Sequence, residues 1–98
     1  MKKLDVIYGK QNSFYGKAEY SVITGPICIA ELRSYGTTVF KLERYGTNPA
    51  RITIDGQGRY SKTTDRHIKE FKTQLDHGNF GTYFELMYKE AKEAMENK

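Results

Sequence analysis

The chain has 98 residues, of which 38% are hydrophobic and 29% are charged. This length predicts a single domain with a small core, and the 13% aromatic content argues against a disordered chain. The formal net charge of +4 is compatible with a nucleic acid or an acidic protein as partner, and no apolar stretch approaches the length of a membrane span.

The cysteine count and the first residues indicate a reducing compartment. Cys28 is the only cysteine, which excludes an intramolecular disulfide. The opening residues, M-K-K-L-D-V-I-Y-G-K, contain no apolar core of signal-peptide length. We therefore expect the protein to act in the cytoplasm, without a membrane partner.

The first sixty residues predict a meander of short antiparallel strands. Alternating or β-branched runs separated by glycine-containing turns favour four to five of them. The expected strands are Leu4–Tyr8, Lys17–Thr24, Ile27–Tyr35, Thr38–Tyr45 and Ala50–Asp55. Two tight turns are expected to separate the last three strands, at Gly36-Thr37 and at Gly46–Pro49.

A helix is expected over 61–77, because apolar residues recur there at helical spacing. Ile68, Phe71 and Leu75 form its apolar face, together with Thr64. The candidate N-caps are Ser61, Thr63 and Thr64, and Asp65 suits the positive end of the helix dipole. The residues expected on the opposite, polar side are Arg66, Lys69, Glu70, Lys72 and Thr73. Gly78 is the expected C′ residue.

A second helix is expected over 79–97. Asn79 is a candidate cap, and Thr82-x-x-Glu85 matches a capping box. The expected apolar stripe contains Phe80, Phe84, Met87, Ala91 and Ala94, widened by Tyr83 and Met95. This helix is expected either to complete the layer on the sheet or to project toward a partner.

The order of the elements, strands before helices, predicts one α+β domain over residues 1–98. Residues 1–60 are expected to form mainly a β meander. The helix over 61–77 is expected to pack on one face of the sheet, and the C-terminal helix follows it.

No catalytic, metal-binding or cofactor-binding motif is found in the sequence. Gly56-Gln57-Gly58 lacks the third glycine and the helix of a phosphate loop, so it predicts a turn. His67 and His77 are too few for an evident metal site. Cys28 with His67 would make a nucleophile and base only if they met, and Cys28 lies in an apolar strand pattern. We expect no enzyme activity and no cofactor.

Cations and tyrosines are concentrated in the middle strands and the start of the central helix. Arg33, Lys41 and Arg51 are expected to face away from that helix. The candidate partner-binding residues are Arg33, Tyr35, Lys41, Arg44, Tyr45, Arg51, Arg59, Tyr60, Lys62 and Arg66. Such residues contact phosphates, stack on bases or form protein hot spots. The alternative is an ordinary solvated sheet face, on which Glu31 and Glu43 pair with some of the cations.

Three motifs carry a family resemblance: S-F-Y-G-K-A (Ser13–Ala18), L-R-S-Y-G-T-T-V (Leu32–Val39) and Y-S-K-T-T-D-R-H-I-K-E-F (Tyr60–Phe71). They resemble a family of small uncharacterised proteins carried by phages, plasmids and conjugative elements of Gram-positive bacteria. Its members share a Y-S-x-T-T-x-R-H-I-x-E-F signature and an S-Y-N-T-like turn, where this chain has Gly36 in place of Asn. The helix over Phe80–Lys98 lies outside the shared part.

The resemblance implies an accessory protein of a mobile element, and such proteins often act by binding. We expect stoichiometric binding to a host protein in the bacterial cytoplasm, most concretely inhibition of a CRISPR–Cas nuclease or a similar defence complex, as anti-CRISPR proteins do. The alternative is an AP2-like module that binds nucleic acid through the Arg/Tyr-rich sheet face. A monomer and a homodimer are both compatible with the sequence; in a dimeric module the seam would be Tyr83, Phe84 and Met87.

Overall fold

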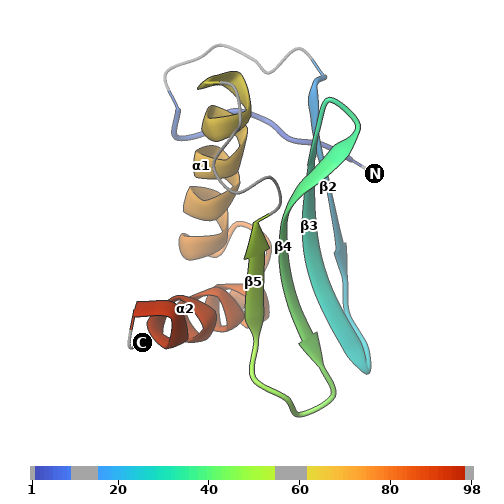
Figure 1. The fold of residues 1–98 in the computed structure, drawn as a ribbon, viewed down its shortest axis with the longest axis vertical. Helices are drawn as coiled ribbons and strands as arrows, with labels where there is room; N and C mark the ends of the chain where they lie inside the picture. The colour runs from blue at the N-terminus through green and yellow to red at the C-terminus, as the bar shows by residue number, and fades with distance from the viewer. Residues whose placement is uncertain (1, 10–15, 55–61, 97–98) are drawn as a thin grey trace.

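The computed structural model describes residues 2–9, 16–54 and 62–96, and within them it shows an α+β fold (Figure 1). Five strands precede two helices. The strands are β1 (Lys2–Lys3), β2 (Ala18–Ile23), β3 (Ile27–Ser34), β4 (Thr37–Tyr45) and β5 (Arg51–Ile54). The helices are α1 (Lys62–Asp76) and α2 (Thr82–Glu96). The predicted fold class is confirmed.

The sheet is an antiparallel meander in which the strands lie in chain order, β1-β2-β3-β4-β5. A two-residue turn joins β3 to β4, with Ser34 paired to Thr37. Tyr35 and Gly36 have φ values of 53° and 80°, as the central residues of a type I′ turn require. The turn therefore lies at Tyr35-Gly36, one residue earlier than predicted.

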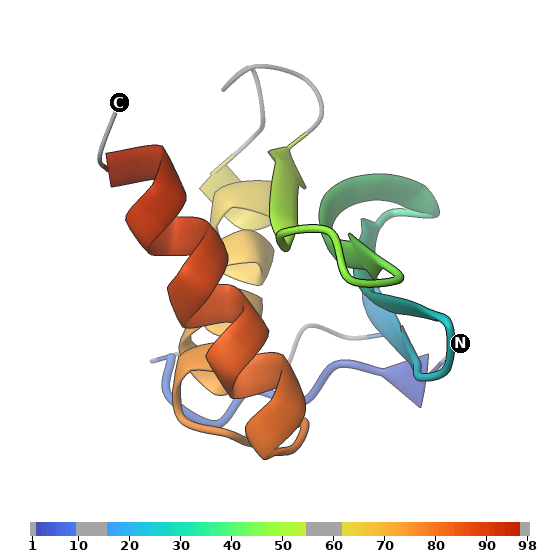
Figure 2. The ribbon, with the colours of Figure 1, turned by 90° about the horizontal axis from the view of Figure 1, so that it is seen from below.

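Both helices cover the same face of the sheet, and α2 runs across the end of α1 (Figures 1 and 2). The strands contribute inward-facing residues such as Ala30, Leu32 and Leu42, all of which are fully buried. Phe40 contacts Phe71 of α1 edge to face, with ring centroids 5.6 Å apart. The core is therefore one layer of side chains between the sheet and the two helices.

Helix α1 buries the apolar face that its sequence predicts, including Ile68, Phe71 and Leu75. It ends at Asp76, and Gly78 with φ 77° follows as the C′ residue. The Gly78 N–H donates to the Leu75 carbonyl and the Asn79 N–H to the Gln74 carbonyl, which is a Schellman motif. Of the candidate caps, Thr63 and Thr64 lie inside the helix, and Ser61 lies outside the described residues.

Glu70 corrects the predicted polar side of α1, because its side chain is buried. Its carboxylate accepts the backbone N–H groups of Ile7, Tyr8 and Gly9 at distances of 2.6–3.3 Å. The Gln74 amide donates both to Glu70 and to the Asp5 carbonyl. We call Glu70, Gln74 and the backbone of residues 5–9 the N-terminal clamp.

The N-terminal clamp explains why the strand predicted over Leu4–Tyr8 does not form. Only Lys2–Lys3 pairs as β1, and the Leu4 N–H makes one further bond to the Ala18 carbonyl. The following backbone turns toward α1, where the buried Glu70 carboxylate accepts the N–H groups of Tyr8 and Gly9. Leu4 still enters the core.

Helix α2 belongs to the core, which settles the alternatives left by its sequence. Phe84, Met87, Tyr88 and Ala91 are buried against the sheet and α1. The dimer seam suggested by the sequence is therefore wrong for Phe84 and Met87, because both side chains are buried within the chain itself, although Tyr83 is exposed. Hydrophobic spacing alone does not distinguish a helix that packs on its own sheet from one that packs on a partner.

The start of α2 also differs from its prediction. The Glu85 N–H donates to the Gly81 carbonyl, so Gly81 is the cap residue and Thr82 the first helical residue. Asn79 lies in the turn before it, and the capping box does not form. Phe80, outside the helix, packs between Tyr20 and Phe71. No helix in the described part of the chain is long and apolar enough to cross a membrane.

Candidate interaction surface

The sheet face opposite the helices carries no layer of secondary structure in the described chain, and we call it the open face (Figure 2). Strand alternation places on it the side chains that flank the buried ones. Arg33, Lys41 and Arg51 lie there, as their strand positions predict. The other described residues of this face are Lys3, Glu19, Ser21, Ile23, Ile27, Ile29, Glu31, Thr38, Glu43, Tyr45 and Thr53.

Each of these three cations lies beside a carboxylate. The register sets Arg33 opposite Glu19, Lys41 opposite Glu31, and Arg51 opposite Glu43. Arg33 also forms an ion pair with Glu31, its Nε lying 3.4 Å from the carboxylate. Directly opposed charges of unlike sign stabilise neighbouring strands. Positive and negative side chains thus alternate on the open face, which is not a continuous basic surface.

One end of the open face is apolar. Ile23 is paired with Ile29, and Ile27 with Tyr45. Ile23, Ile27 and Tyr45 are 54%, 44% and 45% exposed, which is unusual for side chains of this size. The Tyr45 hydroxyl donates to Glu43, and this hydrogen bond raises the pKa of Tyr45. We call Ile23, Ile27, Ile29 and Tyr45 the apolar end.

Arg44 lies on the helix side of β4, away from the other candidate cations. Its guanidinium donates to the Tyr83 hydroxyl at 3.3 Å, pairs with the Glu90 carboxylate and lies over the Tyr83 ring. The Tyr83 hydrogen bond, followed by the attraction of Glu90, raises the pKa of Arg44. Arg44 therefore links the sheet to α2 and is not part of the open face.

Three other candidates come from a different end of the sheet. Tyr35 stands on the β3–β4 turn, 57% exposed, with its ring centroid 5.9 Å from that of His67. Lys62 and Arg66 are exposed on the first two turns of α1. Arg59 and Tyr60 lie outside the described residues.

A buried polar cluster fixes the turn to α1. The Ser34 hydroxyl lies 2.8 Å from His67 Nδ1 and 3.0 Å from the Thr64 hydroxyl. Burial lowers the pKa of His67, so its ring is neutral near pH 7. These residues belong to the second and third motifs noted in the sequence, which indicates that those motifs meet to hold β3 on α1.

The hypothetical pair of Cys28 and His67 is wrong. Cys28 Sγ donates to the Gly25 carbonyl at the start of β3, whereas His67 contacts Ser34 at the end of that strand. Six residues of strand separate the two positions, which is about 20 Å. The described residues contain no group of three or more His, Cys, Asp or Glu side chains that could hold a metal ion.

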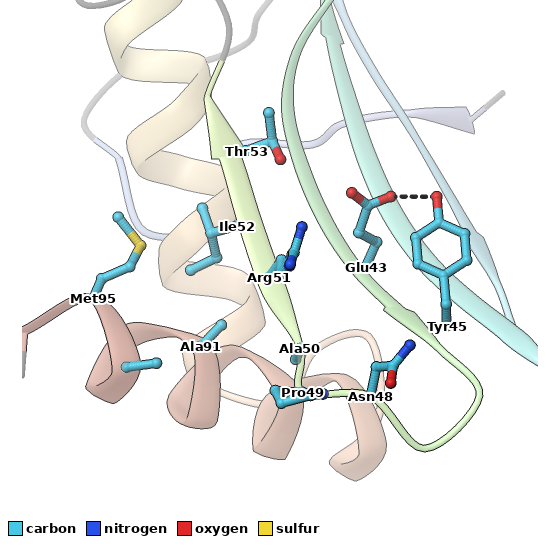
Figure 3. Close-up of a pocket in the computed structure, with 11 residues that line it drawn as sticks. Glu43, Tyr45, Asn48, Pro49, Ala50, Arg51, Ile52, Thr53, Ala91 and Met95 are labelled. Atoms are coloured by element: carbon cyan, nitrogen blue, oxygen red, sulfur yellow. Dashed lines mark hydrogen bonds between the residues drawn. The ribbon is translucent and has the colours of Figure 1, made fainter.

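A hollow of about 890 Å³ surrounds β5 (Figure 3). Arg51 and Thr53 border it from the open face, whereas Ile52, Ala91 and Met95 border it from the helix side. A hollow lined from both sides of one strand includes the outer edge of that strand. The sequence pattern did not predict this feature, because it depends on how far α2 covers β5.

The apolar end was also missed as a candidate surface. Its isoleucines lie in strand sequences that alternate only weakly, so they resemble core residues. Tyr45 alone was among the candidates. The signal available in the sequence was the presence of apolar residues on both faces of β3, with Ile27 and Ile29 on the face opposite Cys28 and Ala30, which a sheet covered on one side does not need.

Comparison with known proteins identifies a family but no activity. A model of a Family of unknown function (DUF8033) matches residues 2–86. No curated protein and no solved structure matches the chain.

Proposed function

We propose that this chain, which belongs to the family of unknown function DUF8033, acts without catalysis by binding another protein through the open face of its sheet. The observation that carries this proposal is the apolar end, with Ile23, Ile27 and Tyr45 exposed side by side. A protein interface typically has an apolar centre and a polar rim. Here the apolar end would supply the centre, and the neighbouring charged rows the rim.

The charges of the open face favour a protein over a nucleic acid as its partner. A surface that binds phosphates gains its affinity from uncompensated cations. Arg33, Lys41 and Arg51 each lie opposite a glutamate, so the field above the sheet alternates in sign. An AP2-like arrangement in a DNA groove would bring those glutamates close to phosphates.

The target that we propose is a host defence complex in the bacterial cytoplasm, such as a CRISPR–Cas nuclease. This part of the proposal is supported by the resemblance of the three motifs to proteins of phages and other mobile elements. Binding of this kind would inhibit at a stoichiometric ratio, because an inhibitor without turnover blocks one target molecule per copy.

A capture experiment tests the binding mode. Tagged protein is incubated with host lysate, with and without nuclease treatment, beside the variant Ile27→Asp and the control Thr24→Asp. Ile27 lies in the apolar end, while Thr24 is an exposed residue of the adjacent turn. The expected result is a discrete protein that survives nuclease, is lost with Ile27→Asp and is retained by Thr24→Asp.

Two results would contradict the proposal. Capture that disappears after nuclease treatment, and falls steeply with salt, would identify the nucleic-acid binder instead. Equal capture by the wild type and Ile27→Asp would remove the open face from the binding mode. The target class is tested by titrating the purified protein into a defence nuclease: cleavage should stop near equimolar inhibitor, and full cleavage at excess would refute it.

A further inference from the structure

The two edges of the sheet differ in how they are protected. At one edge stands β1, which is two residues long and consists of Lys2 and Lys3. Short, lysine-bearing edges discourage pairing with another strand. At the other edge stands β5, whose sequence Arg51–Ile54 contains no lysine and no proline. No strand of the described chain pairs with its outer side.

The register shows which β5 groups point outward. The Gly46 N–H donates to the Pro26 carbonyl, so positions 26 and 46 form a hydrogen-bonded pair. Such pairs recur at every second residue of an antiparallel ladder. Leu42 therefore bonds to β3, whereas Lys41 and Glu43 bond to β5. Their partners Thr53 and Arg51 use their backbone groups inside the sheet, which leaves those of Ile52 and Ile54 directed outward.

A hollow leaves space beside the outward groups of Ile52. The hollow around β5 runs along this edge, with Arg51 and Thr53 on one flank and Ala91 and Met95 on the other (Figure 3). Ala91 and Ala94 are small, and Ile52 is only half-buried. A strand added here would place alternate side chains on the open face and against the exposed end of α2.

We propose that the added strand is β5 of a second copy, so that two chains form one continuous antiparallel sheet. A two-fold axis at Thr53 pairs Ile52 of each copy with Ile54 of the other and Thr53 with its own counterpart. This register joins the outward backbone groups of Ile52 and Ile54 in reciprocal hydrogen bonds. Pairing of a strand with itself about a two-fold axis is the isologous contact of a symmetric dimer.

The side chains of β5 favour a second copy as the occupant. Aligned antiparallel with itself about Thr53, the strand matches isoleucine with isoleucine on the helix side and threonine with threonine on the open face. Ile52 and Ile54 are only partly buried in a single chain, so this pairing covers apolar surface that one copy leaves accessible. Threonine pairs are also favourable cross-strand neighbours.

The dimer is independent of the proposed partner protein. The two-fold axis is perpendicular to the sheet, so both open faces would lie on the same side and join into one surface. Self-association needs only the purified chain, whereas the proposed function needs a partner. Either proposal can therefore fail while the other stands.

Sedimentation equilibrium of the full chain tests the dimer. Its weight-average mass should rise with concentration from 11.3 kDa toward twice that value. Thr53→Lys and Thr53→Glu each place like charges opposite one another at the axis, and each should weaken self-association about fivefold. An equimolar mixture of the two variants should associate more tightly than either variant alone, because only the hybrid dimer sets the introduced lysine against the introduced glutamate.

Matched controls use Ser21, which lies on the same face of the sheet but on β2. Ser21→Lys and Ser21→Glu should leave the wild-type association unchanged. A wild-type chain that stays monomeric up to millimolar concentration would overturn the dimer. So would charge effects that are equal at Ser21 and Thr53, or a mixture that associates no better than its components.

Discussion

Tyr35 is the only non-glycine residue with positive φ in the described chain. A left-handed conformation costs a residue with a Cβ about 1–3 kcal/mol. Type I′ turns favour Asn-Gly at the two positions that Tyr35 and Gly36 occupy. The strain is offset locally, since Ser34 before the turn is held by Thr64 and His67.

Tyr35→Asn should therefore stabilise the fold by about 1 kcal/mol, because asparagine tolerates the left-handed region that tyrosine resists. Urea denaturation of the two proteins measures the difference. Tyr45→Asn is the comparison, since Tyr45 has no positive φ, and it should not stabilise. A loss of stability in Tyr35→Asn would mean that the ring contact with His67 outweighs the backbone strain.

His67 should make the fold less stable as the pH falls. Burial lowers its pKa below the ordinary value of 6.5, so the native state resists protonation. Below about pH 6.5 the unfolded chain binds a proton that the native chain does not bind, and this stabilises the unfolded state. Above that pH both states are neutral and the effect disappears.

Denaturation at pH 7.5 and at pH 5 checks the effect of His67. The free energy of unfolding should be lower at pH 5 than at pH 7.5 in His77→Gln, because His77 is exposed. In His67→Gln the part of this decrease that comes from His67 should be absent. His67→Gln should also be less stable at neutral pH, since it disturbs the hydrogen bond to Ser34. Identical pH dependence in both variants would contradict the assignment.

At the scale of elements, α1 holds the N-terminal segment as well as the sheet. The Glu70 carboxylate is nearly inaccessible and accepts three backbone N–H groups from residues about sixty positions earlier. This arrangement fixes residues 5–9 without a strand ladder. Glu70 and Phe71 of the signature motif therefore have different roles. Glu70 binds the backbone of the N-terminal segment, whereas Phe71 packs against the sheet.

Glu70→Ala should destabilise the protein by about 1–3 kcal/mol, because it removes the charged acceptor of three partly buried backbone hydrogen bonds. Amide hydrogen exchange should accelerate at Ile7, Tyr8 and Gly9 before it changes in β3. Glu70→Gln retains one acceptor oxygen, so its stability should lie between those of the wild type and Glu70→Ala. Lys69→Ala, on the exposed side, should change stability by less than about 0.5 kcal/mol. Unchanged exchange at residues 7–9 would refute the N-terminal clamp.

At the scale of the molecule, the core extends beyond the part matched by the family. That match ends at Leu86, yet Met87, Tyr88 and Ala91 of the following turns are buried. The remainder of α2 is thus part of the domain in this protein and not an appendage. It covers the inner sides of β4 and β5.

A chain that ends after Leu86 should lose its cooperative unfolding transition. Removing the Met87 side chain alone is worth about 2–5 kcal/mol, against a total stability of about 5–15 kcal/mol for a domain. Thermal unfolding followed by circular dichroism provides the measurement. Met95→Ala is the control, because Met95 is mostly exposed and its loss should be small. A shortened chain that still melts cooperatively would show that the remaining elements fold without the rest of α2.

The local sequence was sufficient for β2 to β5 and for both helices. Alternation and helical spacing are properties of neighbouring residues, and they report which face of an element is apolar regardless of what covers it. The orientation of Arg33, Lys41 and Arg51 followed from the same alternation. So did the end of α1, because a C′ glycine acts within one turn.

Tertiary structure alone decided the rest, because the deciding contacts join residues far apart in the chain. Helical spacing predicts a solvated position for Glu70, and only the fold brings the backbone of residues 7–9 to its carboxylate. Likewise, nothing in the sequence near Ser34 indicates that His67 is its hydrogen-bond partner. Alternation places Arg44 on the helix side of β4, but only the packing of α2 brings Tyr83 and Glu90 to its guanidinium. Composition counts charges, whereas register decides which charges lie opposite one another. The register places Glu31 and Glu43 beside cations of the open face, which is the arrangement that the sequence had left as an alternative.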